Sequence, residues 1–191
     1  MEKLVYEVPS IQRKQDAIDY INEFYAHNSE VNGSGGLDRY VDNYEEWLIK
    51  LEKDLKQIPS EERVPAKTFF LVRESDNKKV GMINIRLFLN KRLKEEGGHI
   101  GYSIRPTERR KGYNKINLYL GLIECQKLGI KEALLDCDKN NLGSAKTMIA
   151  LGGKLICEYF YEDMNAQKYC INVDESIEKY KNEYCDKVKV K

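Results

Sequence analysis

The sequence predicts a single-domain α/β protein in which helices pack against a mixed β-sheet. Apolar runs rich in β-branched and aromatic residues alternate with segments of helical periodicity along most of the chain. The length of 191 residues suits one domain with its own hydrophobic core. Charged residues make up 33% and hydrophobic residues 41%, which is typical of a soluble globular protein. The expected order is β-α-α-β-β, followed by a strand, a basic loop, and α-β-α-β-β.

The N-terminal part predicts one strand and two helices. Residues 4–8 read as a strand that ends at a proline. Ser10 is suited to cap a helix that runs to about residue 26. Apolar residues at helical spacing predict a second helix over residues 37–57. The glycine-rich connection at residues 27–36 is either a surface loop or a wall of a binding site.

The central and C-terminal parts predict a hairpin and then alternating elements. A charged segment at residues 87–96, with a possible helical turn, separates the hairpin from the next strand. Asn140 or Asn141 is suited to cap the last helix of this part. Residues 174–191 read as a peripheral helix or a loose tail. The expected strands are residues 68–72, 79–86, 99–105, 133–137, 154–161 and 167–173, and the expected helices are residues 113–128 and 141–150.

The stretch from Gly98 to Asn114 has the features of an anion site. It begins as an apolar strand, passes through a proline, and becomes a basic loop that opens a helix. Five basic residues and one acid lie between Arg105 and Lys115. The N-terminus of a helix offers unpaired N–H groups and the positive end of the helix dipole. We therefore expect this stretch to bind a phosphate-bearing ligand.

The bulk composition excludes several other classes of protein. The net charge of +1 argues against a dedicated nucleic-acid binder. Five cysteines without C-x-x-C spacing argue against a zinc site and a disulfide framework, so we expect no metal and reduced thiols in a cytoplasmic protein. No stretch resembles a signal peptide or a membrane span, so no membrane association is expected.

The hexamer from Arg109 to Asn114 resembles the signature of the GNAT superfamily of acetyl-CoA-dependent N-acetyltransferases. That signature is Q/R-x-x-G-x-G/A, with Arg109 at the first position and Gly112 at the first glycine. Asn114 departs from the final Gly or Ala. The flanking segments Ile104-Arg105-Pro106, Leu128-Gly129-Ile130 and Asn141-Leu142-Gly143-Ser144 also match the family, and the resemblance extends from about Val80 to Val173.

The resemblance implies a GNAT fold with a mostly antiparallel sheet, formed by residues 1–173, and acetyl-CoA as cosubstrate. It places the CoA pyrophosphate in the loop that Arg109 opens. The backbone of Ser103 and Ile104 would pair with the pantetheine arm, and Asn141 would reach the same arm. The backbone donors to the pyrophosphate would be Arg110, Lys111, Gly112, Tyr113 and Asn114.

The resemblance also implies direct attack of an amine on the thioester, without a nucleophilic cysteine. The family often has a tyrosine that acts as general acid seven residues after the helix-capping asparagine, where this chain has Met148. Tyr102 and Tyr113 are the nearby tyrosines that could replace it. His99 is the candidate base because its ordinary pKa suits proton transfer near neutral pH. Glu95 and Glu96, acting through water, are the alternatives.

The leading functional hypothesis is an N-acetyltransferase for a primary amine of a small molecule, peptide or protein. The alternatives are a CoA-binding module without catalysis, which the absence of the usual tyrosine favours, and an RNA-associated protein, which the net charge disfavours. The acceptor pocket is expected to involve residues 32–40, with Arg39 and Tyr40, and residues 159–168. Glu162 and Asp163 in the latter segment would attract a cationic amine. The chain is expected to be a monomer or a homodimer.

Overall fold

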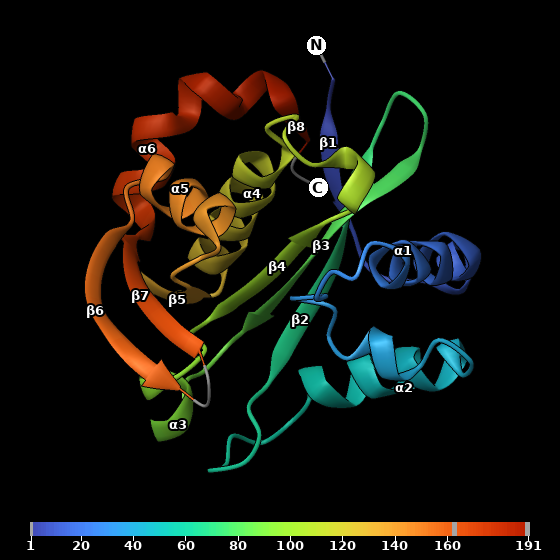
Figure 1. The fold of residues 1–191 in the computed structure, drawn as a ribbon, viewed down its shortest axis with the longest axis horizontal. Helices are drawn as coiled ribbons and strands as arrows, with labels where there is room; N and C mark the ends of the chain where they lie inside the picture. The colour runs from blue at the N-terminus through green and yellow to red at the C-terminus, as the bar shows by residue number, and fades with distance from the viewer. Residues whose placement is uncertain (1, 162–163, 190–191) are drawn as a thin grey trace.

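A computed structural model describes residues 2–161 and 164–189 and contains two β-sheets with helices between and around them (Figure 1). The five-stranded sheet has the order β4-β3-β2-β1-β8, and the three-stranded sheet has the order β5-β7-β6. Every pairing is antiparallel except that of β1 with β8. The strands are β1 Leu4–Glu7, β2 Ala66–Arg73, β3 Lys78–Arg86, β4 Ile100–Ile104, β5 Glu132–Asp138, β6 Lys154–Tyr161, β7 Met164–Asn172 and β8 Val188–Lys189.

Helices cover both faces of the large sheet. α1 and α2 pack on one face and α4 packs on the other, against β3 and β4 (Figure 1). The α1/α2 face encloses a core that includes Trp47 and Phe70, and the α4 face encloses a second core that extends to the small sheet. The helices are α1 Lys14–Ala26, α2 Tyr44–Leu55, α3 Lys91–Glu95, α4 Tyr113–Lys127, α5 Leu142–Ala150 and α6 Val173–Tyr184. The predicted α/β architecture with a mostly antiparallel sheet is confirmed.

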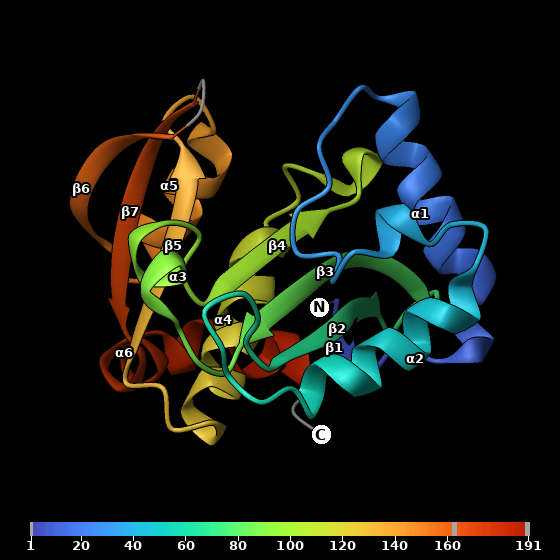
Figure 2. The ribbon, with the colours of Figure 1, turned by 90° about the horizontal axis from the view of Figure 1, so that it is seen from below.

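The two sheets touch at one point and then separate. The N–H of His99 donates to the carbonyl oxygen of Leu134 at 2.7 Å, and Gly98 forms an isolated bridge with Leu135. Beyond this point β4 and β5 diverge toward the basic loop (Figure 2). The gap between them exposes one edge of β4, and this edge becomes part of the cleft described below.

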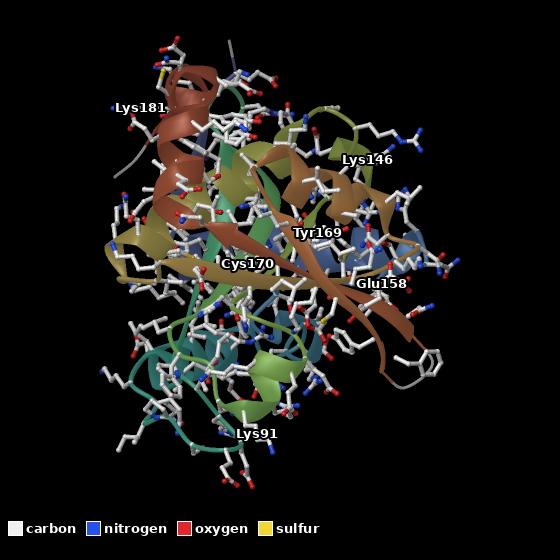
Figure 3. All side chains as sticks on the ribbon, turned by 90° about the vertical axis from the view of Figure 1, so that its left-hand side faces the viewer. Lys91, Lys146, Glu158, Tyr169, Cys170 and Lys181 are labelled. Carbon is white, nitrogen blue, oxygen red and sulfur yellow. The ribbon has the colours of Figure 1, made fainter. Side chains whose placement is uncertain are left out.

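The C-terminal segment forms α6, which lies against α4. The ring centroids of Tyr119 and Tyr184 are 4.9 Å apart, and the hydroxyl of Ser176 donates to the carbonyl of Leu151 at 2.7 Å. β6, which carries Glu158, forms the outer edge of the small sheet and lies toward the viewer in Figure 3, and the α1/α2 layer lies on the opposite flank (Figure 1).

Two of the predicted helix starts are wrong. Ser10 makes no side-chain cap, because a 3₁₀ turn over Ile11–Arg13 precedes α1. The second helix begins at Tyr44 and not at residue 37, because Gly36 adopts a left-handed backbone with φ of +86° and residues 37–39 form a separate 3₁₀ turn. A 3₁₀ turn, like an α-helix, places residues three positions apart on one side. The apolar spacing of residues 37–41 therefore continues that of α2 in the sequence.

Candidate active site

The basic loop leaves β4 through a 3₁₀ turn, Pro106–Glu108, which a buried carboxylate holds in place. Glu108 is 4% exposed and accepts hydrogen bonds at 2.8 Å from each of Arg73, Lys78 and Lys111. Burial would raise the pKa of Glu108, but the hydrogen bonds from Lys111, Lys78 and Arg73 outweigh it and lower the pKa to about 2. The one acid of the loop is therefore ionised and fixes the loop to β2 and β3.

The backbone of the loop forms a concave set of donors. Arg110 and Gly112 have left-handed conformations, with φ of +63° and +82°. Within the described residues, the N–H groups of residues 110–114 have no hydrogen-bond partner. A Cβ atom built on Gly112 would have no neighbour within 4 Å, so the space above the loop is open. Unpaired N–H groups at the start of α4 suit a pyrophosphate.

The side chains of the loop contribute less positive charge than the sequence suggests. Arg105 is buried and forms salt bridges with Asp16 at 2.9 Å and Glu23 at 3.1 Å. Lys111 is paired with Glu108. Arg109 donates to the carbonyl of Ile104 at 3.2 Å and to Ser29 at 2.7 Å. Of the five cations, the two exposed ones that line the cleft without a protein partner among the described residues are Arg110 and Lys115.

A cleft of about 1620 Å³ runs from this loop along the exposed edge of β4 to the far end of β3. Pockets for single small ligands usually measure roughly 300–1,000 Å³. The cleft therefore has room for two ligands, one beside the loop and one at the far end.

The exposed edge of β4 presents the amides of Tyr102 and Ile104. Arg86 N–H donates to His99 and Arg105 N–H donates to Val80, so every second residue of β4 hydrogen-bonds to β3. Ser103, which lies opposite Met82, belongs to this inward-facing set, and its hydroxyl bonds the carbonyl of Asn32. The register therefore argues against the predicted pairing of a ligand with the Ser103 backbone, whereas Ile104 faces the cleft.

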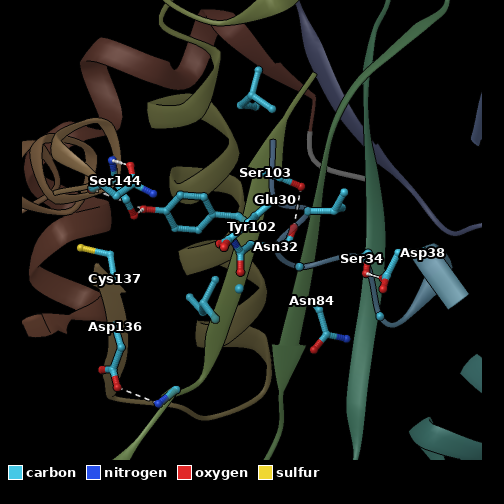
Figure 4. A pocket seen from close by; sticks show the side chains of 18 of the residues that line it. Glu30, Asn32, Ser34, Asp38, Asn84, Tyr102, Ser103, Asp136, Cys137 and Ser144 are labelled. Carbon is cyan, nitrogen blue, oxygen red and sulfur yellow. Dashed lines mark hydrogen bonds between the residues drawn. The ribbon is translucent and has the colours of Figure 1, made fainter. Parts of the chain in front are cut away.

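Tyr102 reaches across the cleft to α5. Its hydroxyl lies 2.8 Å from the Ser144 hydroxyl, and Figure 4 shows the ring spanning the gap. Burial raises the pKa of Tyr102, so the phenol remains protonated. Cys137 lies close by on β5, where burial raises the pKa of its thiol to about 11. The geometry supplies a proton donor and an inert thiol at this point.

His99 is poorly placed to act as a base. Its Nδ1 accepts a hydrogen bond from the Leu134 N–H at 3.1 Å, and its side chain does not line the cleft. Burial, with a contribution from Arg86, lowers the pKa of His99 to about 4. A neutral imidazole whose acceptor nitrogen is already used cannot take up a proton readily, so the geometry argues against the predicted role.

Among the carboxylates at the far end of the cleft, Glu96 and Asp136 are at least half-buried, whereas Glu62 is exposed. Asp136 is 7% exposed and accepts from Lys168 at 2.9 Å, from the Tyr159 hydroxyl at 2.5 Å and from the Gly97 N–H at 2.6 Å. Glu96 is half-buried and makes no side-chain hydrogen bond within the described residues. Sequence reasoning missed Asp136, although an acid inside the apolar run of residues 133–137 is a recognisable signal.

The helix termini around the loop are fixed by asparagines. Asn141 caps α5 by accepting from the Ser144 N–H at 3.1 Å, and it lines the cleft. Asn114 donates to Thr147 at 3.1 Å and so ties α4 to α5. The Tyr113 hydroxyl accepts from Arg73 at 3.0 Å and bonds Glu2, so this side chain points away from the α5 side of the loop. Met148 is fully buried.

The connection between α1 and α2 forms one wall of the cleft. Gly33 lies against β4 so closely that a Cβ atom on it would stand 2.2 Å from the carbonyl oxygen of Gly101. Ser34 donates to Asp38 at 2.7 Å, and Arg39 and Tyr40 also line the cleft. Of the opposite predicted wall, Tyr159 lines the cleft, whereas Glu162 and Asp163 lie outside the described residues.

Across residues 2–161 and 164–189, no helix is long and apolar enough to cross a membrane.

Comparisons with known proteins agree with this geometry. Residues 34–152 match a family model described as "Acetyltransferase (GNAT) family". None of the curated proteins matches the chain in sequence. Among solved structures, RimJ from Mycobacterium smegmatis, in complex with CoA-disulfide, is 13% identical with a TM-score of 0.70 over 93% of this chain and 88% of that chain.

Two further solved structures have the same fold. A chimera of the spermidine N-acetyltransferase SpeG from Vibrio cholerae and hSSAT is 11% identical, with a TM-score of 0.64 over 92% of this chain and 98% of that chain. The yncA protein from Salmonella typhimurium, with its cofactor acetyl-CoA, is 12% identical, with a TM-score of 0.60 over 90% of this chain and 95% of that chain. At these identities the likeness establishes the fold.

Proposed function

The chain belongs to the GNAT family of acetyltransferases, and from this premise we propose that it transfers the acetyl group of acetyl-CoA to a primary amine by direct attack. The observation that carries the proposal is the open, donor-lined loop of residues 110–114 at the mouth of a cleft large enough for two ligands. The amine acceptor would occupy the end of the cleft that lies beyond Tyr102.

The residues present fit acetyl-CoA. The N–H groups of residues 110–114 would hold the pyrophosphate, and Arg110 and Lys115 would add positive charge beside it. The outward amides of Tyr102 and Ile104 would pair with the pantetheine arm as an added strand pairs with a sheet edge. Bound acetyl-CoA supplies an acyl group activated as a thioester.

The chemistry assigned to the protein is proton handling and carbonyl polarisation. Attack of the amine forms a C–N bond and breaks the C–S bond, so one proton leaves the nitrogen and one reaches the thiolate. Tyr102 is the proton donor that the geometry favours. Glu96, acting through water, replaces His99 as the candidate base because its carboxylate lines the cleft. An N–H group on the edge of β4 would polarise the thioester carbonyl.

Release of free CoA tests this function. Acetyl-CoA is offered with a panel of amino acids, polyamines, aminoglycosides and short peptides, and turnover above the rate of thioester hydrolysis is expected with at least one class. Acetyl-CoA binding without turnover across the panel would instead identify a CoA-binding module, which the buried Met148 at the position of the usual tyrosine favours.

A matched pair of glycine variants tests the pyrophosphate assignment. Gly112→Leu and Gly129→Leu place the same side chain at left-handed positions at the two ends of α4, with φ of +82° and +76° and open space at each. Both variants strain the backbone, but only the first puts a side chain over the loop. We expect acetyl-CoA affinity to fall at least tenfold in Gly112→Leu alone, and equal affinities would refute the assignment.

A further inference from the structure

The far end of the cleft collects arginines from three separate elements: Arg63 before β2, Arg86 at the end of β3 and Arg92 on α3. Asn90, which caps α3, donates to the carbonyl oxygens of Ser60 at 3.0 Å and Glu61 at 2.7 Å. This contact fastens the segment that contains Arg63 to the start of α3 (Figure 2). The grouping is thus a product of the tertiary structure.

Arg86 is the half-buried member of this group. Its Nη1 donates to the carbonyl oxygens of Gly97 at 3.0 Å and Gly98 at 2.7 Å, which fixes the direction of the guanidinium. Burial lowers the pKa of Arg86, the charge of Arg92 lowers it further, and the charge of Asp136 acts in the opposite direction. Within the described residues, neither arginine forms a salt bridge. Arg86 and Arg92 therefore line the same end of the cleft, and neither has an anion as a salt-bridge partner among the described residues.

The nearest buried acid cannot serve as that anion. Asp136 is already bound by Lys168, Tyr159 and the Gly97 N–H. Glu96 remains as a carboxylate on the cleft wall. The pKa of the Tyr159 phenol is raised mainly by burial and by Asp136, and the nearby charge of Glu96 makes a smaller contribution. Within the described residues, the far end thus offers two carboxylates without a side-chain partner, Glu62 and Glu96, and three arginines without a salt bridge, a pattern that suits a ligand carrying both charges.

We propose that the acceptor carries, besides its amine, an anionic group that binds the guanidinium groups of Arg86 and Arg92. The group is a carboxylate or a phosphate, because either can take bidentate hydrogen bonds from arginine. This proposal rests on the acetyl transfer proposed above. Ile83 lies opposite Tyr102 in the sheet and Arg86 follows three residues later, which is about 10 Å along the strand. A short molecule can therefore reach both the reacting centre and the arginines.

Matched amines test this specificity. Glycylglycine is compared with glycylglycinamide for the carboxylate, and O-phosphoethanolamine with ethanolamine for the phosphate. We expect kcat/KM to be at least tenfold higher for the anionic member of one pair. The pair that shows the preference identifies the source of the anion. Equal kcat/KM within both pairs, with acetyl transfer observed, overturns the anion site and leaves the transferase function intact.

Variants locate the preference on the arginines. In Arg86→Gln and in Arg92→Gln, the ratio of kcat/KM between the anionic and neutral amine should fall at least tenfold. Arg92 is exposed and makes no side-chain hydrogen bond within the described residues, so this second variant stays informative even if Arg86→Gln folds poorly. Lys94→Gln, which removes an exposed cation of α3 outside the cleft, should leave the ratio unchanged. A fall in that control, or none in the arginine variants, refutes the assignment.

Calorimetric titration in the presence of CoA separates this proposal from the proposed function. Binding of the anionic amine that is lost in Arg92→Gln, without acetyl transfer to any amine, would retain the anion site and refute the transferase function. Failure of both anionic amines to bind more tightly than their neutral partners would refute the anion site whatever the turnover.

Discussion

Lys79 places an amine inside the core beneath α1. Its side chain is fully buried, and its Nζ lies 3.9 Å from the ring centroid of Tyr20 and 4.0 Å from that of Phe70. The Nζ atom has no hydrogen-bond partner within the described residues. We predict that Lys79→Met, which keeps the length of the side chain and removes the amine, stabilises the protein.

The magnitude follows from the protonation of the unfolded chain. Burial lowers the pKa of Lys79 well below the ordinary value of 10.5, so folding favours the neutral amine over the charged one. Taking the proton from an exposed lysine costs about 1.4 kcal/mol for each pH unit below that value, so the penalty for burying a neutral amine is at most about 5 kcal/mol at pH 7. The unfolded chain binds the extra proton, so the penalty falls as the pH rises. The gain from Lys79→Met should therefore shrink by about 1.4 kcal/mol per pH unit between pH 7 and pH 9.

Urea unfolding measures this gain directly. Trp47, the single tryptophan, stacks on Phe70 with ring centroids 5.9 Å apart and so reports on the same core. Lys53→Met, on the exposed face of α2, is the control and should change the unfolding free energy little at any pH. A gain that does not vary with pH, or a loss of stability, would show that the amine is charged and held by the two rings, and would refute the reasoning.

Three further variants test the site. If the phenol is the proton donor, Tyr102→Phe should lower kcat by about 100-fold and leave the affinity for acetyl-CoA unchanged. Stopped-time assays measure kcat, and titration measures the affinity. An unchanged kcat would show that the phenol is not the proton donor. Asn141→Ala removes the cap of α5 and should cost about 1 kcal/mol, a fall in Tm of roughly 2–4 °C by calorimetry. Glu108 loses its proton more readily in the folded state, so its stabilisation should disappear as the pH falls from about 4.5 to about 2. Glu108→Gln should remove that part of the acid sensitivity in urea unfolding, and an unchanged pH profile would contradict the role of the buried carboxylate.

Local patterns predicted most elements well because the relevant forces act over a few residues. The strand-loop-helix order around Gly112 and the cap at Asn141 both follow from short-range preferences, and the structure has both. The burial of Lys79 could not be predicted in the same way. A β-bulge between β2 and β3 pairs Leu71 with Gly81 but Val72 with Lys79, so one extra residue turns the lysine toward the α1 core. A bulge leaves no mark in the alternation of the sequence.

The arrangement of the basic loop could be predicted from the sequence, whereas the arrangement of the far end of the cleft could not. The loop and the start of α4 are contiguous in sequence, so their residue types could be read together. The far end is assembled from Arg63, Arg86, Glu96 and Asp136, which only tertiary contacts bring together. His99 seemed a suitable base by residue type alone, but its ring nitrogen is used by Leu134, a partner 35 residues away.

The contact of Gly33 with Gly101 divides the α1–α2 connection into two lengths of chain that have different partners. Residues 28–32 include Ser29, which Arg109 of the basic loop contacts, and residues 34–36 include Gly35, whose carbonyl oxygen accepts a hydrogen bond from the Lys50 amine. A library aimed at new acceptors must keep glycine at position 35 in the second part, because a Cβ atom there would stand 2.6 Å from the Thr68 hydroxyl oxygen. It must keep glycine at position 33, because any side chain there would collide with the backbone of β4.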